Sequence, residues 1–562
     1  MAAWLLGLGG SEHDYSAALM NNCDMRVAIE QERVSRRKHG FSLWFESPGQ
    51  QAIDYCLAAE DLLMADIEVV VSSDSLPTRV RHSLRTCVLR QFPHHLCHAA
   101  SAYMMLPRGA KAGVIVYDGF GSIRGSVTND PLRNLRETFS FFLFGPNGYE
   151  CIGRTAGVGY AEKDDFPTCV TNSIGMLYEI VNSLLGYELM DSGKTMGLAS
   201  HGFPRYVDML ENFIAYGTDV STCFSCATDD LGLPSTIEQI LLAGRNSFAT
   251  RADLAASLQA IVNKALLNCE RFFYGHDLDY LCISGGCGLN TVANSFLVKN
   301  SKLDVPVVIP PHCGDSGLAF GALWIEQFNR RGSAPELTFR GHPVSTGLAR
   351  PGRHYTRDEC RAAAQQFYPR IVLDPSVISA RDVAHVIVEG AIVGVLNGRS
   401  EIGPRALGGR SIFADPRSII TREKINRLIK KREPFRPLAP IVLRSQYDEY
   451  FYDTRYADPF MLKVARVRER CLREAPAVVH VDGTARVQVV ADDDDPFLVE
   501  LLQAFCKETG TAILLNTSFN RRGEPMVESP LDAIDAFLGM GLDGLYLDGE
   551  FYWPALPAGH NT

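Results

Sequence analysis

The chain carries the stretch FPHHLCHAASAY at residues 92–103, which places three histidines within five residues. The small residues that follow predict a helix with the histidines at its start. His94 and His98 are four residues apart, so a helix would stack them on one face. Two imidazoles in that arrangement can share a metal or clamp a phosphate. Histidines at helical spacing are more often ordinary polar or packing residues, so the pair alone leaves both interpretations open.

The length and composition limit the class of protein. At 562 residues the chain exceeds what one hydrophobic core usually supports, so two or more domains are expected. A hydrophobic fraction of 46% and a charged fraction of 21% are typical of a globular α/β protein and exclude disordered and collagen-like classes. The net charge of −10 gives no overall basic field, so we expect no nucleic-acid partner, and any phosphate site must be local.

The cysteines and the N-terminus predict the compartment. Fifteen cysteines are scattered singly through apolar segments, which indicates reduced thiols and a cytoplasmic location. The CxxC of Cys223 and Cys226 has no second pair at zinc-finger spacing, so a structural metal there is not expected. The N-terminus lacks a basic region and turns polar at residue 11, as a buried first strand would. No run reaches the ~20 apolar residues of a membrane helix, so no membrane association is expected.

Polar residues follow several predicted strands at their carboxyl ends. Residues 4–8 lead into a glycine loop that contains His13, and residues 113–117 lead directly into Asp118. Asp315 has a similar position after another short strand. Acids in such places often hold a metal near a phosphate, because ligands of open α/β sheets gather at strand carboxyl ends, although a turn-forming Asp-Gly is the alternative for Asp118. Together with the histidine pair, the two acids favour a metal site.

Glycine-rich turns and one helix supply candidates for a nucleotide site. A buried strand at residues 281–283 leads to Gly285, Gly286 and Asn290, where bare backbone would let an adenine or ribose lie close. Residues 173–187 show helical periodicity, and Gly175 and Glu179 could face a ligand. The glycine-rich loop at residues 191–202 lacks the spacing of a P-loop.

The second half of the chain is marked by arginines held among glycines and prolines. Residues 332–356 lose apolar periodicity and form the predicted connection between domains. Beyond it lie GPRALG at residues 403–408, a basic run at residues 430–436 and Arg486. Arginines fixed in this way are better suited to bidentate oxyanion binding than to surface solubility. The strand end at residues 516–520 adds hydroxyl and amide donors, whereas Asp492 to Asp495 read as a solvated turn.

Taken in order, these motifs resemble the O-carbamoyltransferase family of antibiotic and nodulation-factor biosynthesis, the NodU and tobramycin (nebramycin) carbamoyltransferase type. The most specific pieces are HHLCHA at residues 94–99, MGLA at 196–199, GPRALG at 403–408, REPFRP at 432–437 and NTSFN at 516–520. The resemblance implies an α/β protein whose N-terminal domain, residues 1–345, has the actin-like ATPase fold (ASKHA, Kae1-like). It implies a C-terminal YrdC-like α/β domain at residues 346–562.

The resemblance also implies the roles of individual residues. The metal, of the Fe²⁺ type, would be held by His94, His98, Asp118 and Asp315, and His13 and His98 would serve catalysis, His13 as a base near the acceptor. Gly285, Gly286 and Asn290 would hold the adenosine of ATP, accompanied by Gly175 and Glu179. Carbamoyl phosphate and the nucleotide phosphates would be bound in the second domain by Arg405, Lys430, Arg436, Arg486, Asn516 and Ser518.

The implied reaction is ATP-dependent O-carbamoyl transfer. Carbamoyl phosphate and ATP would give carbamoyl adenylate in the second domain, and the first domain would pass the carbamoyl group to a hydroxyl of a small natural product. Mg²⁺ accompanying ATP and a homodimeric assembly stay open, as do the metal's identity and the acceptor. Alternatives are a fused tRNA threonylcarbamoylation enzyme, which the net charge disfavours, a hydrogenase-maturation carbamoyltransferase, whose paired CxxC fingers are absent, and a nucleotide-binding scaffold without transfer chemistry.

The sequence departs from the family pattern at two places. Residues 199–202 read ASHG where APYG is usual, and residues 31–33 read QER where two acids and an arginine are usual. Both places lie outside the inferred chemistry, so we expect them to affect acceptor shape rather than the reaction.

Overall fold

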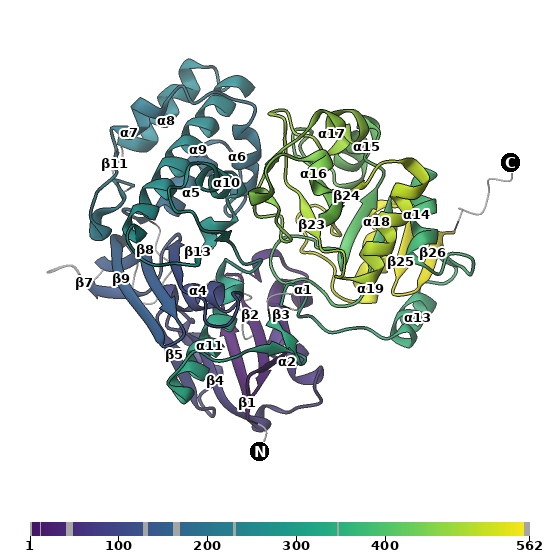
Figure 1. The fold of residues 1–562 in the computed structure, drawn as a ribbon, viewed down its shortest axis with the longest axis horizontal. Coiled ribbons are helices and arrows are strands. Elements are labelled where there is room, and N and C mark those ends of the chain that lie inside the picture. The colour runs from purple at the N-terminus through teal and green to yellow at the C-terminus, as the bar shows by residue number, and fades with distance from the viewer. Residues whose placement is uncertain are drawn as a thin grey trace. The chain divides into compact units, whose positions relative to one another are not determined.

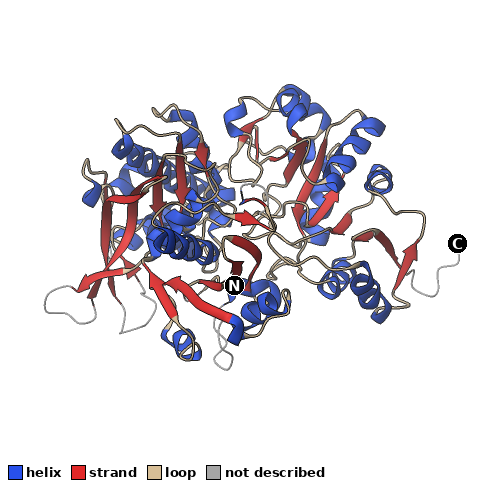
Figure 2. Cartoon of the chain, turned by 60° about the horizontal axis from the view of Figure 1, so that its bottom comes forward, coloured by secondary structure: helices blue, strands red, loops and turns tan. Residues whose placement is uncertain are grey.

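The computed structural model describes residues 3–11, 13–40, 49–126, 133–160, 169–228, 232–344 and 348–555. It divides into two compact units, of which the first comprises residues 1–31 and 39–348 and the second residues 32–38 and 349–562. The predicted boundary at residues 345 and 346 lies outside the described residues. Residues 32–38 are assigned to the second unit although the chain before and after them belongs to the first. Both units are mixed α/β, as the sequence predicts, with helices against the sheets (Figure 2).

The first sheet of unit 1 begins at the N-terminus and has the order β16-β15-β3-β2-β1-β4-β5. Its strands β1, β2 and β3 are antiparallel neighbours, and β1, β4 and β5 run parallel. The strands are β1 (Trp4–Gly9), β2 (Ser16–Asn21), β3 (Asp24–Glu30), β4 (Ile67–Ser73), β5 (Leu89–Phe92), β15 (Thr338–Phe339) and β16 (His342–Pro343). Apolar residues on both faces of β1 and β4 are buried, as expected for parallel strands inside a domain.

The second sheet of unit 1 has the order β10-β9-β8-β6-β13-β14, with β7 paired to β8. Here β9, β8 and β6 are antiparallel neighbours, and β6, β13 and β14 run parallel. The strands are β6 (Ala112–Tyr117), β7 (Ile123–Ser126), β8 (Arg133–Gly145), β9 (Gly148–Tyr160), β10 (Cys169–Val170), β13 (Tyr280–Ser284) and β14 (Val307–Val308). The core order β9-β8-β6-β13-β14 therefore repeats the order β3-β2-β1-β4-β5 of the first sheet.

Helices of unit 1 pack on and between these sheets (Figure 1). They are α2 (Gln50–Ala58), α3 (Thr78–Ser83), α4 (His94–Tyr103), α5 (Ile174–Leu184), α6 (Ser192–Ala199), α7 (Val207–Glu211), α8 (Gly232–Ala243), α9 (Phe248–Glu270), α10 (Thr291–Asn300) and α11 (Leu318–Arg331). The predicted helix at residues 173–187 is α5, and the predicted helix after Pro93 is α4. All ten residues of α4 are buried, the three histidines included.

Helices α4 and α11 join the two sheets of unit 1. Helix α4 packs against β6 and β13, α11 packs against β1 and β4, and the two helices contact each other. At their crossing, a Cβ on Gly321 would lie 1.8 Å from the carbonyl oxygen of Cys97. Only a glycine permits so close an approach, because the opposing atom belongs to the backbone and cannot move aside.

The sheet of unit 2 has eight strands in the order β17-β26-β25-β18-β19-β24-β20-β23. The strands are β17 (Ile371–Asp374), β18 (Val393–Leu396), β19 (Arg410–Ala414), β20 (Ala439–Leu443), β23 (Gln488–Val490), β24 (Ile513–Ser518), β25 (Gly544–Leu547) and β26 (Glu550–Pro554). A separate short pair joins β21 (Ala465–Arg466) to β22 (Thr484–Ala485).

Both faces of this sheet are covered. On β24, Leu514 belongs to one apolar cluster, whereas Ile513 and Leu515 belong to another, as the alternation of side chains along a strand requires. Helices α14 and α18 lie side by side over the face of Leu514 (Figure 1). The helices of the unit are α13 (Arg357–Gln366), α14 (Ala380–Val388), α15 (Ile419–Lys424), α16 (Tyr447–Tyr450), α17 (Glu469–Glu474), α18 (Pro496–Thr509) and α19 (Pro530–Met540).

Among the described residues, no helix is both long enough and apolar enough to cross a membrane.

The contact between α4 and α11 can be tested with two glycine variants. We expect Gly321→Ala to lower the free energy of unfolding by about 1–3 kcal/mol or more, because its methyl group overlaps a backbone carbonyl. Gly193 on α6 is the matched control, since a Cβ there meets no atom within 4 Å. Gly193→Ala should be neutral or stabilise the chain slightly. Equal unfolding midpoints in urea for the two variants would contradict this packing.

Candidate functional site

The carboxyl ends of the strands in unit 1 bring four predicted ligands together. His94 and His98 come from α4, which follows β5; Asp118 follows β6, and Asp315 follows β14 in the short helix η6 (Asp315–Gly317). One donor atom from each lies within 4.8 Å of all the others, and all four residues are buried. The i and i+4 spacing, which was ambiguous in the sequence, therefore places two imidazoles against two carboxylates that are remote in the chain.

The distances in this group suit a metal ion. His94 Nε2 lies 3.1 Å from His98 Nε2, 3.2 Å from Asp118 Oδ2 and 3.6 Å from Asp315 Oδ1. His98 Nε2 lies 3.5 Å from Asp118 Oδ2 and 3.4 Å from Asp315 Oδ1. With metal–ligand bonds of about 2.1 Å, neighbouring donors are about 3.0 Å apart in an octahedron and about 3.4 Å in a tetrahedron. The observed spacing is thus that of ligands facing one centre, and the mixed imidazole and carboxylate set admits iron, manganese or zinc.

Electrostatics also indicates a cation here. Burial would lower the pKa of His98, but hydrogen bonds and charges of Asp118 and Asp315 outweigh it and raise that pKa to about 9. Burial would raise the pKa of Asp118, yet His94 and His98 hold it well below its ordinary value. Two buried carboxylates therefore keep a positive charge between them, which a protonated histidine supplies when no metal is bound.

Further residues fix the ligands in place. Ser75, two residues beyond β4, hydrogen-bonds to Nδ1 of His94. Ser11 donates to Asp315 Oδ2 at 2.8 Å, and the backbone N–H of Gly286 donates to Asp118 Oδ1 at 3.0 Å. Such outer contacts orient metal ligands and tune their basicity. The sequence held no local signal for Ser75 or Ser11, because each meets its partner only through the strand order.

His95 faces away from the group. Its Nδ1 lies 2.8 Å from Ser140 Oγ and 3.9 Å from Glu137 Oε2, both on β8. Burial lowers the pKa of His95 to about 4, so the ring is neutral near pH 7. This histidine is completely buried and packs in the core.

His13 lies in the loop after β1 and is paired with Asp14. Its Nδ1 is 3.0 Å from Asp14 Oδ2, and Asp14 Oδ1 is 3.0 Å from His39 Nδ1. Burial would lower the pKa of His13, but Asp14, Asp315 and Asp118 raise it to about 9. The imidazolium thus predominates near pH 7, and this form donates protons, whereas the predicted base must be neutral. A cation between Asp118 and Asp315 would oppose the part of the rise in the His13 pKa that these two carboxylates cause.

The predicted nucleotide residues fall into two groups. Gly285 and Gly175 allow close backbone packing around Asp118, since a Cβ on Gly285 would lie 2.3 Å from Tyr117 O and one on Gly175 2.8 Å from Gly119 Cα. Gly285 has a φ of +91°, which favours glycine. Together with Gly286, these glycines line the turn that carries Asp118.

Asn290 and Glu179 have partners within the protein. Asn290 Oδ1 caps α10 by accepting from Ala293 N at 3.0 Å, and its amide pairs with that of Gln259 through two contacts of 3.1 Å. Glu179 accepts hydrogen bonds from Ser192 Oγ and Met190 N. Within the described part of the chain, Gln259 Oε1 is the partner of the Asn290 amide group, so its second hydrogen can serve a ligand. The helical residue Gln259, which the sequence did not single out, orients Asn290.

In unit 2, the predicted site residues are mainly arginines, which are cations. Arg405, Arg432 and Arg436, together with burial, hold the pKa of Arg486 well below its ordinary value, and burial with Arg436 lowers the pKa of Arg432 to about 9. Arg486 Nε and Arg432 Nη2 are buried without a hydrogen-bond partner among the described residues. Because a guanidinium keeps its proton, this repulsion is relieved by an anion. Arg432 belonged to the basic run in the sequence but had not been assigned to the site.

Lys430 completes the cationic group after an unusual helical turn. Residues 425–429 form a π-helical turn, whose last bond runs from Lys430 N to Ile425 O at 2.7 Å. Such turns are frequent at functional sites. Lys430 Nζ donates to Asn520 Oδ1 at 2.8 Å, to Asn520 O at 3.0 Å and to Ser518 Oγ at 3.3 Å. Burial and the neighbouring arginines hold its pKa well below the ordinary value.

Of the remaining predicted residues, Asn516 supports the loop of Arg405. Asn516 Nδ2 donates to Ala406 O at 3.2 Å and to Gln488 Oε1 at 2.7 Å, next to Arg405. Arg436 is half-buried, with its Nε 3.7 Å from Glu433 Oε2. The predicted anion residues are therefore brought together in one unit, with Asn516 holding the loop rather than facing it.

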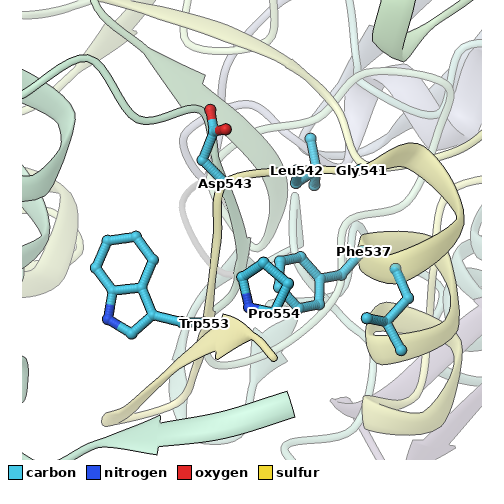
Figure 3. Close-up of a pocket in the computed structure, with 7 residues that line it drawn as sticks. Phe537, Gly541, Leu542, Asp543, Trp553 and Pro554 are labelled. Atoms are coloured by element: carbon cyan, nitrogen blue, oxygen red, sulfur yellow. The ribbon is translucent and has the colours of Figure 1, made fainter. Parts of the chain in front are cut away.

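A pocket of about 530 Å³ in unit 2 has a different character. It is lined by Phe537, Leu538, Gly541, Leu542, Asp543, Trp553 and Pro554 (Figure 3). The carboxylate of Asp543 points away from the rings of Trp553 and Pro554 and accepts from Lys424 Nζ at 3.0 Å. None of the predicted site residues lines it.

Comparison with known proteins gives the family. The N-terminal carbamoyltransferase family model matches residues 76–324, and the C-terminal model matches residues 384–553. The nodulation protein NolNO of Sinorhizobium fredii is 30% identical over 95% of this chain and 78% of its own length. The 3'-hydroxymethylcephem-O-carbamoyltransferase of Amycolatopsis lactamdurans is 34% identical over 48% of each chain. The solved structure of full-length HypF is 15% identical over 59% of this chain and 56% of HypF, and its TM-score of 0.39 is too low for an inference.

The chain belongs to the carbamoyltransferase family and is a transferase enzyme of the O-carbamoyltransferase type. The two family models fall within the two structural units, the first on the unit of the His and Asp group and the second on the unit of the arginines.

The candidate metal site can be tested by replacing one histidine and a matched neighbour. We expect His98→Ala to reduce metal affinity by more than the 10–100-fold typical of an outer contact, because it removes a donor atom. His95→Asn changes an equally buried histidine of the same helix that faces β8, and it should keep its metal. Metal content by mass spectrometry after dialysis against graded chelator measures both. Equal metal content in the two variants would exclude this ligand set.

The anion site can be tested through stability. Arg486→Met removes a buried cation that other arginines repel, so we expect an unchanged or higher melting temperature in the absence of anions. Affinity for inorganic pyrophosphate should fall about 10-fold or more, because a charged hydrogen bond contributes about 1.5–3 kcal/mol. The exposed Arg473→Met on α17 is the control and should change neither property. A lower melting temperature with unchanged pyrophosphate affinity would make Arg486 a structural residue.

Proposed function

We propose that this enzyme transfers a carbamoyl group from carbamoyl phosphate to a hydroxyl of a small natural product, with ATP consumed through carbamoyl adenylate. The observation that carries the proposal is the division of charge between the units. Unit 2 gathers arginines that, together with burial, hold the pKa of Arg486 well below its ordinary value, and unit 1 gathers two buried carboxylates around two imidazoles. A site for polyanionic substrates and a site for a metal are what such a two-stage reaction needs.

In the first stage, Arg405, Arg432, Arg436, Arg486 and Lys430 would bind the phosphates of ATP and carbamoyl phosphate. Water would cleave carbamoyl phosphate to carbamate and phosphate, and the carbamate oxygen would then attack the α-phosphate of ATP and displace pyrophosphate. Several fixed cations are suited to this task, because phosphate and pyrophosphate leave with multiple negative charges. Ser518 and Asn520 hold the ammonium group of Lys430 and so fix its direction. This stage belongs to the domain that the resemblance likens to YrdC.

In the second stage, the first unit would pass the carbamoyl group to the acceptor hydroxyl and release AMP. His94, His98, Asp118 and Asp315 would hold a divalent metal, Fe²⁺ in our proposal, which supplies Lewis acidity toward a carbonyl or phosphate oxygen. The glycine turns at Gly175, Gly285 and Gly286 would admit the adenosine. In its neutral form, His13, oriented by Asp14, would accept the proton of the acceptor hydroxyl.

The repeated strand order of unit 1 supports the actin-like assignment of this domain, since two copies of one five-strand plan lie in its two sheets. The name of the cephem O-carbamoyltransferase, one of the relatives, supports a small-molecule hydroxyl as the acceptor. We accordingly propose a cytoplasmic enzyme without a nucleic-acid partner. The identity of the acceptor would be found by mass spectrometry on a panel of hydroxylated compounds, as a carbamoyl adduct.

The two stages should separate in assays of the whole enzyme. With ATP and carbamoyl phosphate but no acceptor, we expect formation of carbamoyl adenylate or AMP and release of pyrophosphate, and Lys430→Met should reduce it 10-fold or more. His98→Ala should retain this activity and lose transfer to the acceptor, because its side chain lies in the other unit. Absence of any carbamoyl-phosphate-dependent AMP in the wild-type enzyme would refute the proposed reaction.

A further inference from the structure

Residues 32–38 are assigned by their contacts to the second unit, although they lie near the N-terminus of the chain. Helix α1 (Gln31–Ser35) begins at the end of β3 and carries Arg33, whose side chain is completely buried. Arg36 follows with a φ of +59°, a conformation that arginine rarely adopts. A buried guanidinium and a left-handed arginine within four residues indicate that this segment has a specific task.

Arg33 holds the loop that carries Arg405. Its Nη2 donates to Gly403 O at 2.6 Å, two residues before Arg405. The far end of the same loop is fixed by Glu401, whose Oε1 accepts from the backbone N–H groups of Leu407 and Gly409 at 2.7 Å. The loop is therefore held on both sides of Arg405, by Glu401 on the far side and by Arg33 of the N-terminal segment on the near side.

Arg36 holds the loop that supports Lys430. It donates through Nη1 to Met526 O at 2.5 Å and through Nη2 to Pro525 O at 3.1 Å. The next residue back, Glu524, accepts from Asn520 Nδ2 at 2.7 Å through its carbonyl oxygen. Asn520 Oδ1 in turn accepts from Lys430 Nζ at 2.8 Å. A continuous path of hydrogen bonds, with one backbone step from Pro525 to Glu524, thus connects Arg36 to the ammonium group.

We propose that Arg33 and Arg36 are positioning residues of the anion site, which fix the loops of Arg405 and Lys430 from the N-terminal segment. This inference rests on the proposed function of that site. If Arg33 has this role, residues 31–33 contribute to the chemistry, contrary to the expectation from the sequence, and residues 346–562 alone lack part of the site. The sequence could not reveal this, because Arg33 and Gly403 are separated by 370 residues.

The test measures pyrophosphate affinity and the KM for carbamoyl phosphate on the full chain. We expect Arg36→Ala and Arg33→Ala each to weaken pyrophosphate binding and raise that KM about 10-fold, while metal content stays at the wild-type level. Arg36→Lys keeps a cationic donor and should restore part of the affinity. Arg37→Ala is the matched control, because Arg37 lies in the same segment and is exposed.

A double variant separates positioning from general stability. If Arg36 acts through Asn520, the variant with both Arg36→Ala and Asn520→Ala should bind pyrophosphate no more weakly than the weaker single variant. If Arg36 and Asn520 acted independently, their losses of pyrophosphate affinity would multiply in the double variant. That result would overturn the proposed path. Unchanged affinity in Arg36→Ala, or an equal loss in Arg37→Ala, would overturn the inference itself.

The outcomes distinguish this inference from the proposed function. If the wild-type enzyme bound pyrophosphate but formed no AMP from carbamoyl phosphate, the proposed reaction would fail, and the binding measurements would still decide the role of Arg36. If Arg33→Ala did not fold, the partly exposed Arg36, with both of its variants, would carry the test.

Discussion

The first unit depends on one electrostatic constraint, which is that Asp118 and Asp315 are buried beside each other and need positive charge between them. Neither carboxylate could be buried there alone without a large desolvation cost. His98 supplies that charge as imidazolium or, in our account, His94 and His98 share the carboxylates with a metal. Much of the local architecture follows from this need. The parallel strands end at the group, Gly285 lets the Asp118 turn lie close to a neighbouring strand, and Gly321 lets α4 approach α11.

The second unit has an excess of positive charge, whereas the first unit has two neighbouring carboxylates. Its arginines repel each other inside a partly buried site, and the pKa of Arg486 is lowered both by burial and by three other guanidiniums. Such an arrangement reduces stability unless it binds an anion, so its presence is better explained by binding than by folding. In the reaction that we propose, the arginines of the second unit would bind phosphate substrates and the His and Asp group of the first unit would bind a metal.

The sequence predicted those parts of the site that depend on local periodicity. His94 and His98 were paired because a helix places residues four apart on one face. Asp118 and Asp315 were found because each follows a predicted strand, and the α/β class followed from the same strands and helices. The basic run around Lys430 was visible, but nothing in it distinguished the partly buried Arg432 from the exposed Lys431. Asn290 was predicted to hold the adenosine, and in the structure its side chain caps α10. Ser75, Gln259 and Arg33 were missed, because each acts on a residue far away in the chain.

X-ray absorption spectroscopy of the metal-loaded wild-type enzyme tests the central claim most directly. The account predicts a first shell of nitrogen and oxygen donors only, with the multiple scattering of two imidazoles and metal–ligand distances of about 2.0–2.2 Å. A sulfur shell near 2.3 Å would assign the metal to cysteines such as Cys223 and Cys226 and would contradict the His and Asp site.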